Sequence, residues 1–354
     1  MSDDLLRLPI HDVAFGGSGV ARLDGKVYFI PFTAPGEVVK ARVVRDKKKF
    51  AEAELVEIEQ RSPARVEPPC PHFSHCGGCA YQHLAYDEQL RLKARQVEET
   101  LRRVGRIAEP PMRPIVAAPE PYAYRNRIRV HAEGGVIGFY AQGSHALVDV
   151  EECRIATPAV NASLAELRQG PRLDGDYTVA GRTRSVFFEQ TNDEVARLLV
   201  AAVHDSVRRE QAVLIDAFCG AGLFAKYLAD LFPAVIGIEE NGYAVEQARR
   251  NASPKEHYVA GDVSFHLGDI LAAHPADRTT VIIDPPAIGV APRVIDLLLG
   301  SAPVEIVYVS CNPATLARDL SLLCRGRYRL ESVTPFDMFP QTAEIEVVAH
   351  LARM

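Results

Sequence analysis

One cysteine, Cys311, lies between an expected apolar strand at residues 304–310 and an expected helix. Asn312 suits the N-cap of that helix and Pro313 its first position, so the helix start is indicated independently of the cysteine. A thiol at a helix N-terminus meets unpaired backbone N–H groups and the positive end of the helix dipole, which favour the thiolate. The sequence therefore predicts a reactive nucleophile at Cys311. The alternative is a buried structural cysteine.

Acidic residues end a series of other apolar strands. Asp216-Ala-Phe-Cys-Gly-Ala-Gly222 follows one strand, Glu239 ends the next, Asp262 follows a third, and Asp284-Pro-Pro follows a fourth. Glycines at a helix start let backbone approach a ligand, and a carboxylate at the end of the next strand can accept both hydroxyls of a ribose. A dinucleotide-binding fingerprint would need a third glycine where Ala225 stands. In the alternative interpretation, Asp216 and Glu239 only cap turns.

Four cysteines form a second candidate site, with the spacing Cys70-x5-Cys76-x2-Cys79 and a distant Cys153. In a cytoplasmic protein this pattern favours metal binding over disulfides. Zinc ribbons generally use two matched Cys-x2-Cys knuckles, whereas three of these thiols share one loop. Cys219 and Cys324 are interpreted as structural.

The elements that must position these residues change in character along the chain. Short alternating segments broken by glycines at residues 8–60 are typical of a small antiparallel barrel. A helix at about 87–104 and short strands to about 185 follow. From residue 192, helices alternate with apolar strands, which predicts a mostly parallel sheet covered by helices. We expect three domains, at residues 1–62, 63–185 and 186–354.

The composition is that of an ordinary globular chain of 354 residues, with 47% hydrophobic and 24% charged residues. The first residues lack a basic and then apolar leader, and no long apolar segment follows, so we expect a cytoplasmic protein without membrane association. The net charge of −6 excludes indiscriminate nucleic-acid binding. Any such role must use local patches: residues 91–129 carry ten Lys or Arg against four acids, and residues 47–49 are all Lys.

The loop at residues 216–222 with Glu239 resembles class I S-adenosylmethionine methyltransferases. Together with other motifs, it makes the chain closely similar to the RNA 5-methyluridine methyltransferases, nearly from end to end. The motifs are Ser310-Cys-Asn-Pro-Ala-Thr-Leu-Ala-Arg-Asp319, Asp337-Met-Phe-Pro-Gln-Thr-Ala-Glu-Ile-Glu346, Phe188-x-Gln190-x-Asn192, Tyr124-Arg-Asn126 and a TRAM-like N-terminal segment.

This resemblance implies a fold, an activity and cofactors. It implies a TRAM-like barrel, a small central α+β domain with a [4Fe–4S] cluster on the four cysteines in preference to zinc, and a Rossmann-like α/β methyltransferase domain. Cys311 would add to uracil C6, and Glu346 would remove the C5 proton after methylation. The residues implied in binding S-adenosylmethionine are Gln190, Phe218, Gly220, Gly222, Leu223, Glu239, Asp262 and Asp284.

The chain departs from the family pattern at several points. Ala287 follows Asp-Pro-Pro where Arg is usual, and Gln341 and Glu344 stand where the family has His. The stretch between Cys153 and Phe188 is short, so the central domain is expected to be reduced.

The expected substrate is 23S rRNA, because the TRAM-like segment is similar to that of the rRNA enzymes. A tRNA T-loop uridine is the alternative within the same chemistry. A non-catalytic iron–sulfur RNA-binding protein and a small-molecule methyltransferase are alternatives of other classes. No obligate protein partner is expected.

Overall fold

The computed structural model describes residues 5–171, 173–181, 190–208, 210–250 and 252–354. The chain forms two compact units. The first consists of Met1–Gln96, Ala118–Val186 and Phe339–Glu344, and the second of Val97–Ala117, Phe187–Met338 and Ile345–Met354. The expected domain boundary at 185/186, and Phe188, lie outside the described residues.

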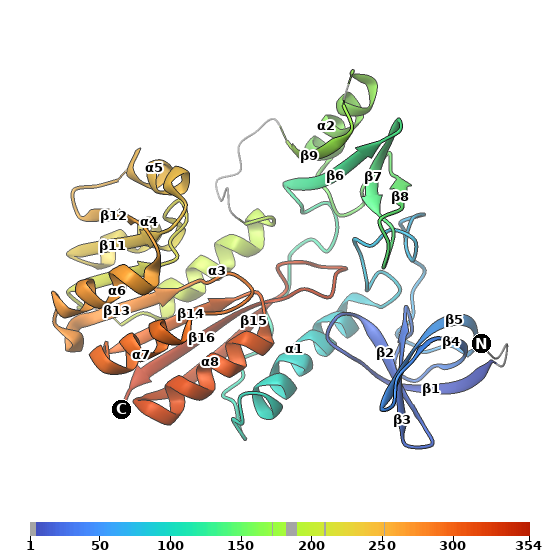
Figure 1. The fold of residues 1–354 in the computed structure, drawn as a ribbon, viewed down its shortest axis with the longest axis horizontal. Coiled ribbons are helices and arrows are strands. Elements are labelled where there is room, and N and C mark those ends of the chain that lie inside the picture. Colours follow the sequence, from blue (N-terminus) through green and yellow to red (C-terminus); the bar gives the residue numbers. More distant parts are fainter. Residues whose placement is uncertain (1–4, 172, 182–189, 209, 251) are drawn as a thin grey trace. The chain divides into compact units, whose positions relative to one another are not determined.

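A closed barrel of five strands begins the first unit, in the order β1-β2-β3-β5-β4 (Figure 1). Alternate residues such as Leu8, Ile10 and Val39 fill its core, as the period-2 pattern predicted. β3 and β5 pair in parallel, so the barrel is not wholly antiparallel as expected. The strands are β1 (Leu6–Val13), β2 (Ser18–Leu23), β3 (Lys26–Pro31), β4 (Val38–Asp46) and β5 (Phe50–Gln60).

A smaller sheet and two helices complete the elements of the first unit. The helix α1 (Tyr86–Arg103), which the sequence predicted, gives its first part to this unit and its last turns to the second. The sheet has the order β8-β7-β6-β9 and is covered by α2, whose Val160 and Leu164 join the sheet's apolar core. Its elements are β6 (Arg127–Glu133), β7 (Val136–Tyr140), β8 (Leu147–Asp149), α2 (Pro158–Gln169) and β9 (Gly175–Ala180).

Only strands were expected in this region, so α2 corrects the prediction. Thr157 caps it by accepting from Val160 N at 3.3 Å, and Pro158 is its first residue. A Thr-Pro helix start was therefore present in the sequence and was overlooked.

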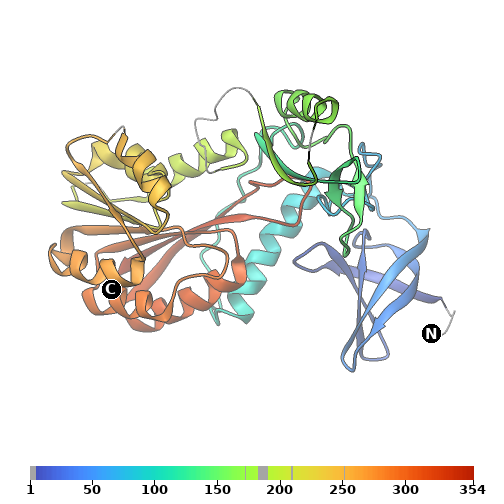
Figure 2. The ribbon, with the colours of Figure 1, turned by 45° about the horizontal axis from the view of Figure 1, so that its top comes forward.

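The second unit is built on a sheet with the order β12-β11-β10-β13-β14-β16-β15, in which β12 to β14 run parallel and β15 and β16 form an antiparallel edge. Helices lie over both of its faces, with α6, α7 and α8 in a row over one of them (Figures 1 and 2). The sequence predicted this mostly parallel architecture. The parallel strands are β10 (Val213–Ala217), β11 (Ala234–Glu239), β12 (Glu256–Ala260), β13 (Thr279–Ile283) and β14 (Glu305–Ser310).

The remaining elements among the described residues are two long strands, six α-helices and two short 3-10 helices, η1 (Ala229–Leu231) and η2 (Ala276–Arg278). The strands are β15 (Tyr328–Phe336) and β16 (Glu346–Arg353). The helices are α3 (Asp193–Ser206), α4 (Leu223–Leu228), α5 (Gly242–Arg250), α6 (Val263–Ala272), α7 (Pro292–Ser301) and α8 (Pro313–Gly326). Within the described ranges, no helix is both long and apolar enough to cross a bilayer.

Candidate active site

Cys311 lies between the end of β14 and the start of α8, as predicted. Asn312 caps the helix by accepting from Ala314 N at 3.0 Å, and Pro313 is its first residue. The thiol is half-buried. The predicted helix start is therefore confirmed, and it places Cys311 directly before the positive end of the α8 dipole.

Glu346 lies beside Cys311 because of strand pairing. β14 and β16 are antiparallel neighbours, with Val309 opposite Val348 and Ser310 opposite Val347. The next position of this ladder sets Cys311 opposite Glu346, which is the first residue of β16 and only 4% exposed. The register thus brings two residues separated by 35 positions in the sequence to the same end of the sheet, one with a thiol and the other with a buried carboxyl group.

A pocket of 590 Å³ opens at the carboxyl edge of the parallel strands. This edge is where open α/β sheets bind ligands. Six of the eight residues predicted to bind the cofactor line it: Gln190, Phe218, Gly220, Glu239, Asp262 and Asp284.

Gly222 and Leu223 are not among the residues that line the pocket. Gly222 has a φ of +87°, and a Cβ there would lie 2.7 Å from the Tyr258 hydroxyl oxygen. Glycine is therefore required for helix–strand packing at this position. Leu223 begins α4 directly behind it. A loop motif alone does not show which of its members face the ligand.

For Glu239, the sequence suggested either ribose binding or the capping of a turn, and the structure is compatible with both. The Glu239 carboxylate accepts from Gly220 N at 3.0 Å and from Asn241 N at 2.8 Å, so it orders the loops that follow the neighbouring strands β10 and β11. A carboxylate offers about four acceptor sites, which leaves capacity for ligand hydroxyls. Asp216, by contrast, is fully buried and accepts from Ala225 N at 2.8 Å, as the turn-capping interpretation predicted.

Asp262 caps α6 by accepting from Ser264 N at 2.6 Å, and this hydrogen bond lowers the pKa of its carboxyl group. Its exposed side chain remains charged and faces the pocket. Asp284 directly follows β13, where the two prolines stop the strand. These two acids thus line the pocket from the ends of β12 and β13, which are separated in the sheet by β11 and β10.

Sequence reasoning missed most of the loop after Asp284 and the helix starts around the pocket. They are neighbours of the predicted carboxylates in the sequence, which is the one clue that could have identified them. The missed lining residues are Glu240, Asn241, Ala244, Val263, Ser264, Pro286, Ile288, Gly289, Ala291 and Val294.

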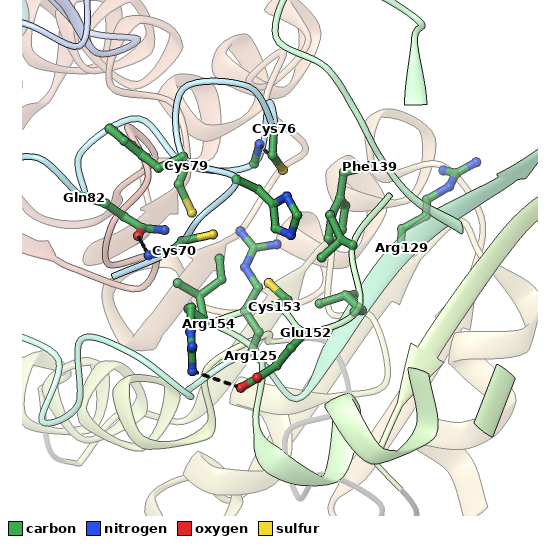
Figure 3. A pocket seen from close by; sticks show the side chains of 16 residues that line it. Cys70, Cys76, Cys79, Gln82, Arg125, Arg129, Phe139, Glu152, Cys153 and Arg154 are labelled. Atoms are coloured by element: carbon green, nitrogen blue, oxygen red, sulfur yellow. Dashed lines mark hydrogen bonds and ion pairs between the residues drawn. The ribbon is translucent and has the colours of Figure 1, made fainter. Parts of the chain in front are cut away.

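The four predicted metal-binding cysteines line a second, separate cavity of 190 Å³ in the first unit (Figure 3). All are free thiols. Burial raises the pKa of Cys76 and of Cys153, and it raises that of Cys79 to about 12. Among the described residues, no group of three or more His, Cys, Asp or Glu side chains is arranged to hold a metal ion.

The two departures at Gln341 and Glu344 have structural roles in the first unit. Gln341 is buried, has a φ of +69°, and exchanges hydrogen bonds with the side chain of Gln89 at 3.0 and 3.1 Å. Its carbonyl oxygen also accepts from Ala80 N and Tyr81 N. Glu344 is exposed and lies 3.7 Å from Arg125.

Ion pairs and burial reduce the free positive charge of residues 91–129. Arg91, Arg102 and Arg103 each pair with a glutamate of the preceding helical turn. Lys93 is buried and donates to the Phe339 carbonyl oxygen at 3.0 Å. The predicted basic patch is consequently weaker than the sequence count suggests, whereas residues 47–49 are exposed.

Comparison with known proteins adds to this geometry. Residues 5–56 match the TRAM domain family, and residues 265–354 match the tRNA (Uracil-5-)-methyltransferase family. An uncharacterized RNA methyltransferase of Gloeobacter violaceus is 33% identical, over 98% of this chain and 96% of its own length. One of Bdellovibrio bacteriovorus is also 33% identical, over 98% and 94%.

A solved structure of Pyrococcus abyssi tRNA (uracil-54, C5)-methyltransferase in complex with S-adenosyl-L-homocysteine is also similar. It has a TM-score of 0.74 and 26% identity, and the similarity covers 98% of this chain and all of that one. The alignment with the Gloeobacter relative extends over 445 positions, more than the 354 residues of this chain. That relative therefore contains segments that are absent here.

Proposed function

Because the chain belongs to the RNA uracil-5 methyltransferase family, we propose that it makes 5-methyluridine in RNA, with Cys311 as the nucleophile and Glu346 as the base. The family match and the similar proteins indicate that the chain is an S-adenosylmethionine-dependent RNA methyltransferase. The observation that carries the proposal is the β14–β16 register, which, continued by one position, sets Cys311 opposite Glu346. Cys311 follows β14, whose neighbour β13 is followed by Asp284 of the pocket lining. A thiol and a carboxyl group are the two side chains that this chemistry requires.

The reaction starts at the thiol. Uracil C5 is too weak a nucleophile to accept a methyl group unaided. Cys311 Sγ adds to C6, and the electrons of the C5–C6 double bond move to give an enolate with carbon nucleophilicity at C5. The N-terminus of α8 favours the thiolate that this step consumes.

S-adenosylmethionine supplies the methyl group, which C5 takes from its sulfonium sulfur. Glu346 then accepts the proton from C5. The electrons of the C–H bond re-form the C5–C6 double bond, and the Sγ–C6 bond breaks to return the thiolate. Glu346 is only 4% exposed, so it is shielded from bulk water at the point where it would accept this proton.

The other residues bind and orient. We propose that Glu239 accepts the ribose hydroxyls of the cofactor and that Asp262 contacts its adenine. Gln190 and Asp284 border the position of the target base. All four line the same pocket, which supports this assignment. The target base must leave its stack to enter.

We also propose that Cys70, Cys76, Cys79 and Cys153 hold a [4Fe–4S] cluster. No three of these described side chains converge on a single ion, but a four-iron cluster needs its thiolates around it, one for each iron, and the four thiols do line one cavity. The Arg125 guanidinium lines the same cavity, and its positive charge would offset that of the thiolates. The cluster's role is structural, since the methylation consumes no electron.

Iron and sulfide content tests this assignment. Anaerobically prepared protein is expected to contain both, and Cys153→Ser to lose them. Cys324→Ser, which changes a half-buried thiol elsewhere, should keep them. Equal metal content in all three proteins would refute the assignment.

Two RNA classes are candidates. The expectation of 23S rRNA depended on the barrel, but the similarity to the Pyrococcus abyssi tRNA enzyme covers 98% of the chain and so includes the barrel. A tRNA T-loop uridine therefore stands as a second candidate with a specific observation behind it. Both belong to the cytoplasm, which is the location we propose.

Methyl transfer to unmodified transcripts tests the function. Labelled S-adenosylmethionine is supplied with 23S rRNA and with tRNA side by side, and the labelled position is mapped. Label in 5-methyluridine of either RNA, absent with Cys311→Ala, is the expected result. Retained turnover in Cys311→Ala would exclude the mechanism, and no label in either RNA would favour a non-catalytic RNA-binding protein.

A further inference from the structure

The loop at residues 286–290, which follows Asp284, is tied to the start of α8. Asn312 Nδ2 and Thr315 Oγ1 both donate to the carbonyl oxygen of Ala287, at 3.0 and 3.1 Å. These bonds use only the backbone of Ala287. The loop can therefore be held with alanine at a position where the related enzymes usually have Arg.

The second turn of α8 holds the next part of the loop. Arg318 Nη2 donates to the carbonyl oxygen of Ile288 at 3.2 Å and to that of Val290 at 3.5 Å. The buried Asp319 carboxylate accepts from Val290 N at 3.2 Å and from the Tyr308 hydroxyl of β14 at 2.8 Å. We name the four side chains Asn312, Thr315, Arg318 and Asp319 the α8 clamp.

Gly289 allows this close approach. Its φ is +77°, and a Cβ there would lie 2.5 Å from Arg318 Nη2 and 2.7 Å from Asp319 Oδ2. A side chain at this position would separate the loop from the helix. The loop backbone is thus fixed against α8, which begins two residues after Cys311.

The side chain of Ile288 is the exception to this fixed arrangement. It is 77% exposed although its backbone is held on both sides, and it lines the pocket. A large apolar side chain in such a place gains free energy when a ligand covers it.

Strand order indicates which ligand this is. The loop follows β13, which lies next to β14, and β14 ends at Ser310, directly before Cys311. Glu239 and Asp262 end or follow β11 and β12, on the other side of β10. Ile288 therefore belongs to the part of the pocket nearer the nucleophile, where the base must lie.

On the basis of the proposed function, we infer that Ile288 forms an apolar wall against the target uracil and that the α8 clamp positions it relative to Cys311. Ile288 contacts the substrate, whereas Arg318 acts through Ile288. A pyrimidine presents an apolar face to such a wall, while its polar edge is left for Gln190 and Asp284.

Kinetics of Ile288 variants test the contact. Ile288→Ala should raise KM for RNA about tenfold, the lower end of what a lost apolar contact costs in a pocket. The Kd for S-adenosylhomocysteine should not change. Ile288→Leu should keep a nearly normal KM. Leu322→Ala, an exposed leucine of α8 outside the pocket, is the control. An unchanged KM in Ile288→Ala, or a change confined to the Kd, would overturn the inference.

A double-mutant cycle tests the clamp. Arg318→Ala should raise KM for RNA, whereas Arg325→Ala, which removes an exposed arginine from the last turn of α8, should not. In an Ile288→Ala background the Arg318 effect should largely disappear, because the contact that it positions is gone. An equally large effect in both backgrounds would show that Arg318 does not act through Ile288.

The proposed function and the inference about Ile288 can be refuted separately. If the wild-type protein makes no 5-methyluridine, the proposed function fails. If it does and Ile288→Ala has the wild-type KM, only the inference about Ile288 fails.

Discussion

At the residue scale, the site combines side chains whose identity was readable from the sequence with backbone contacts that were not. Cys311, Glu239 and Asp284 could be identified because each follows or ends an apolar strand. Ile288 could not be, because an isolated isoleucine has no pattern. Its position depends on hydrogen bonds from α8 to the loop backbone.

Glu239 gives the first prediction at this scale. Glu239→Gln should weaken binding of S-adenosylhomocysteine roughly ten- to hundredfold, since a hydrogen bond to a charged group is worth about 1.5–3 kcal/mol. One of its oxygens would also become an amide donor facing a backbone N–H. Calorimetric titration measures the change. Glu246→Gln, an exposed glutamate of α5, is the control, and equal affinities in both variants would contradict the role of Glu239.

His83 gives a pH prediction. It is 1% exposed, its Nε2 lies 3.2 Å from the Thr33 carbonyl oxygen, and burial lowers its pKa from 6.5 to about 4. The unfolded chain therefore binds this proton more readily than the folded one between these values, so stability falls as the pH is lowered through that window and is constant above it. The loss should reach about 3 kcal/mol.

Urea unfolding at pH 7 and near pH 4 measures this loss. His83→Gln, which keeps a donor for Thr33, should lack this share of the acid destabilisation. A variant that is as acid-sensitive as the wild type would show that His83 does not titrate in this way.

At the element scale, helix starts were the most predictable features. The Asn312-Pro313 start of α8 was placed correctly because capping is a local interaction. The Thr157-Pro158 start of α2 is equally local and was overlooked. The parallel β3–β5 pair was not predictable, because pairing between strands distant in the sequence depends on how the whole barrel closes.

Asn312 both caps α8 and donates to the loop at Ala287, and substitutions at this position can separate these two roles. Asn312→Asp keeps the acceptor for Ala314 N but loses the donor to Ala287, so stability should be retained while KM for RNA rises. Asn312→Ala loses both bonds and should also cost about 1 kcal/mol of stability. Urea unfolding and steady-state kinetics measure the two effects. Identical kinetics in Asn312→Asp and the wild type would exclude a role for the loop bond.

At the scale of the whole molecule, the sequence predicted a barrel, a cysteine-containing region and an α/β region, but not the division into two units. Residues 97–117 belong to the second unit and Phe339–Glu344 to the first, so each unit contains segments that are separated in the sequence. Long-range hydrogen bonds such as that between Gln89 and Gln341 contribute to this division, and no local sequence pattern predicts them. The resemblance implied joint roles for Cys311 and Glu346, but no local pattern showed that they lie opposite each other, because that depends on strand register.

The barrel should contribute to RNA affinity through its exposed lysines. Replacing Lys47, Lys48 and Lys49 with Ala should weaken RNA binding and reduce the slope of log affinity against log salt by up to about 2 to 3, with kcat at saturating RNA unchanged. The matched control is the triple variant of Lys26, Lys40 and Arg42, which already pair with acids of the barrel. If replacing Lys47, Lys48 and Lys49 weakens RNA binding less than the control variant does, the proposed role of these lysines is contradicted.

The most direct test of the account is the intact mass of Glu346→Gln protein after incubation with S-adenosylmethionine and the RNA that the wild type methylates. Without the base, the C5 proton stays and the thiolate cannot leave. We therefore predict a protein–RNA adduct that maps to Cys311, carries the transferred methyl group, and is absent from the double variant with Cys311→Ala. Full turnover of Glu346→Gln without an adduct would contradict the mechanism.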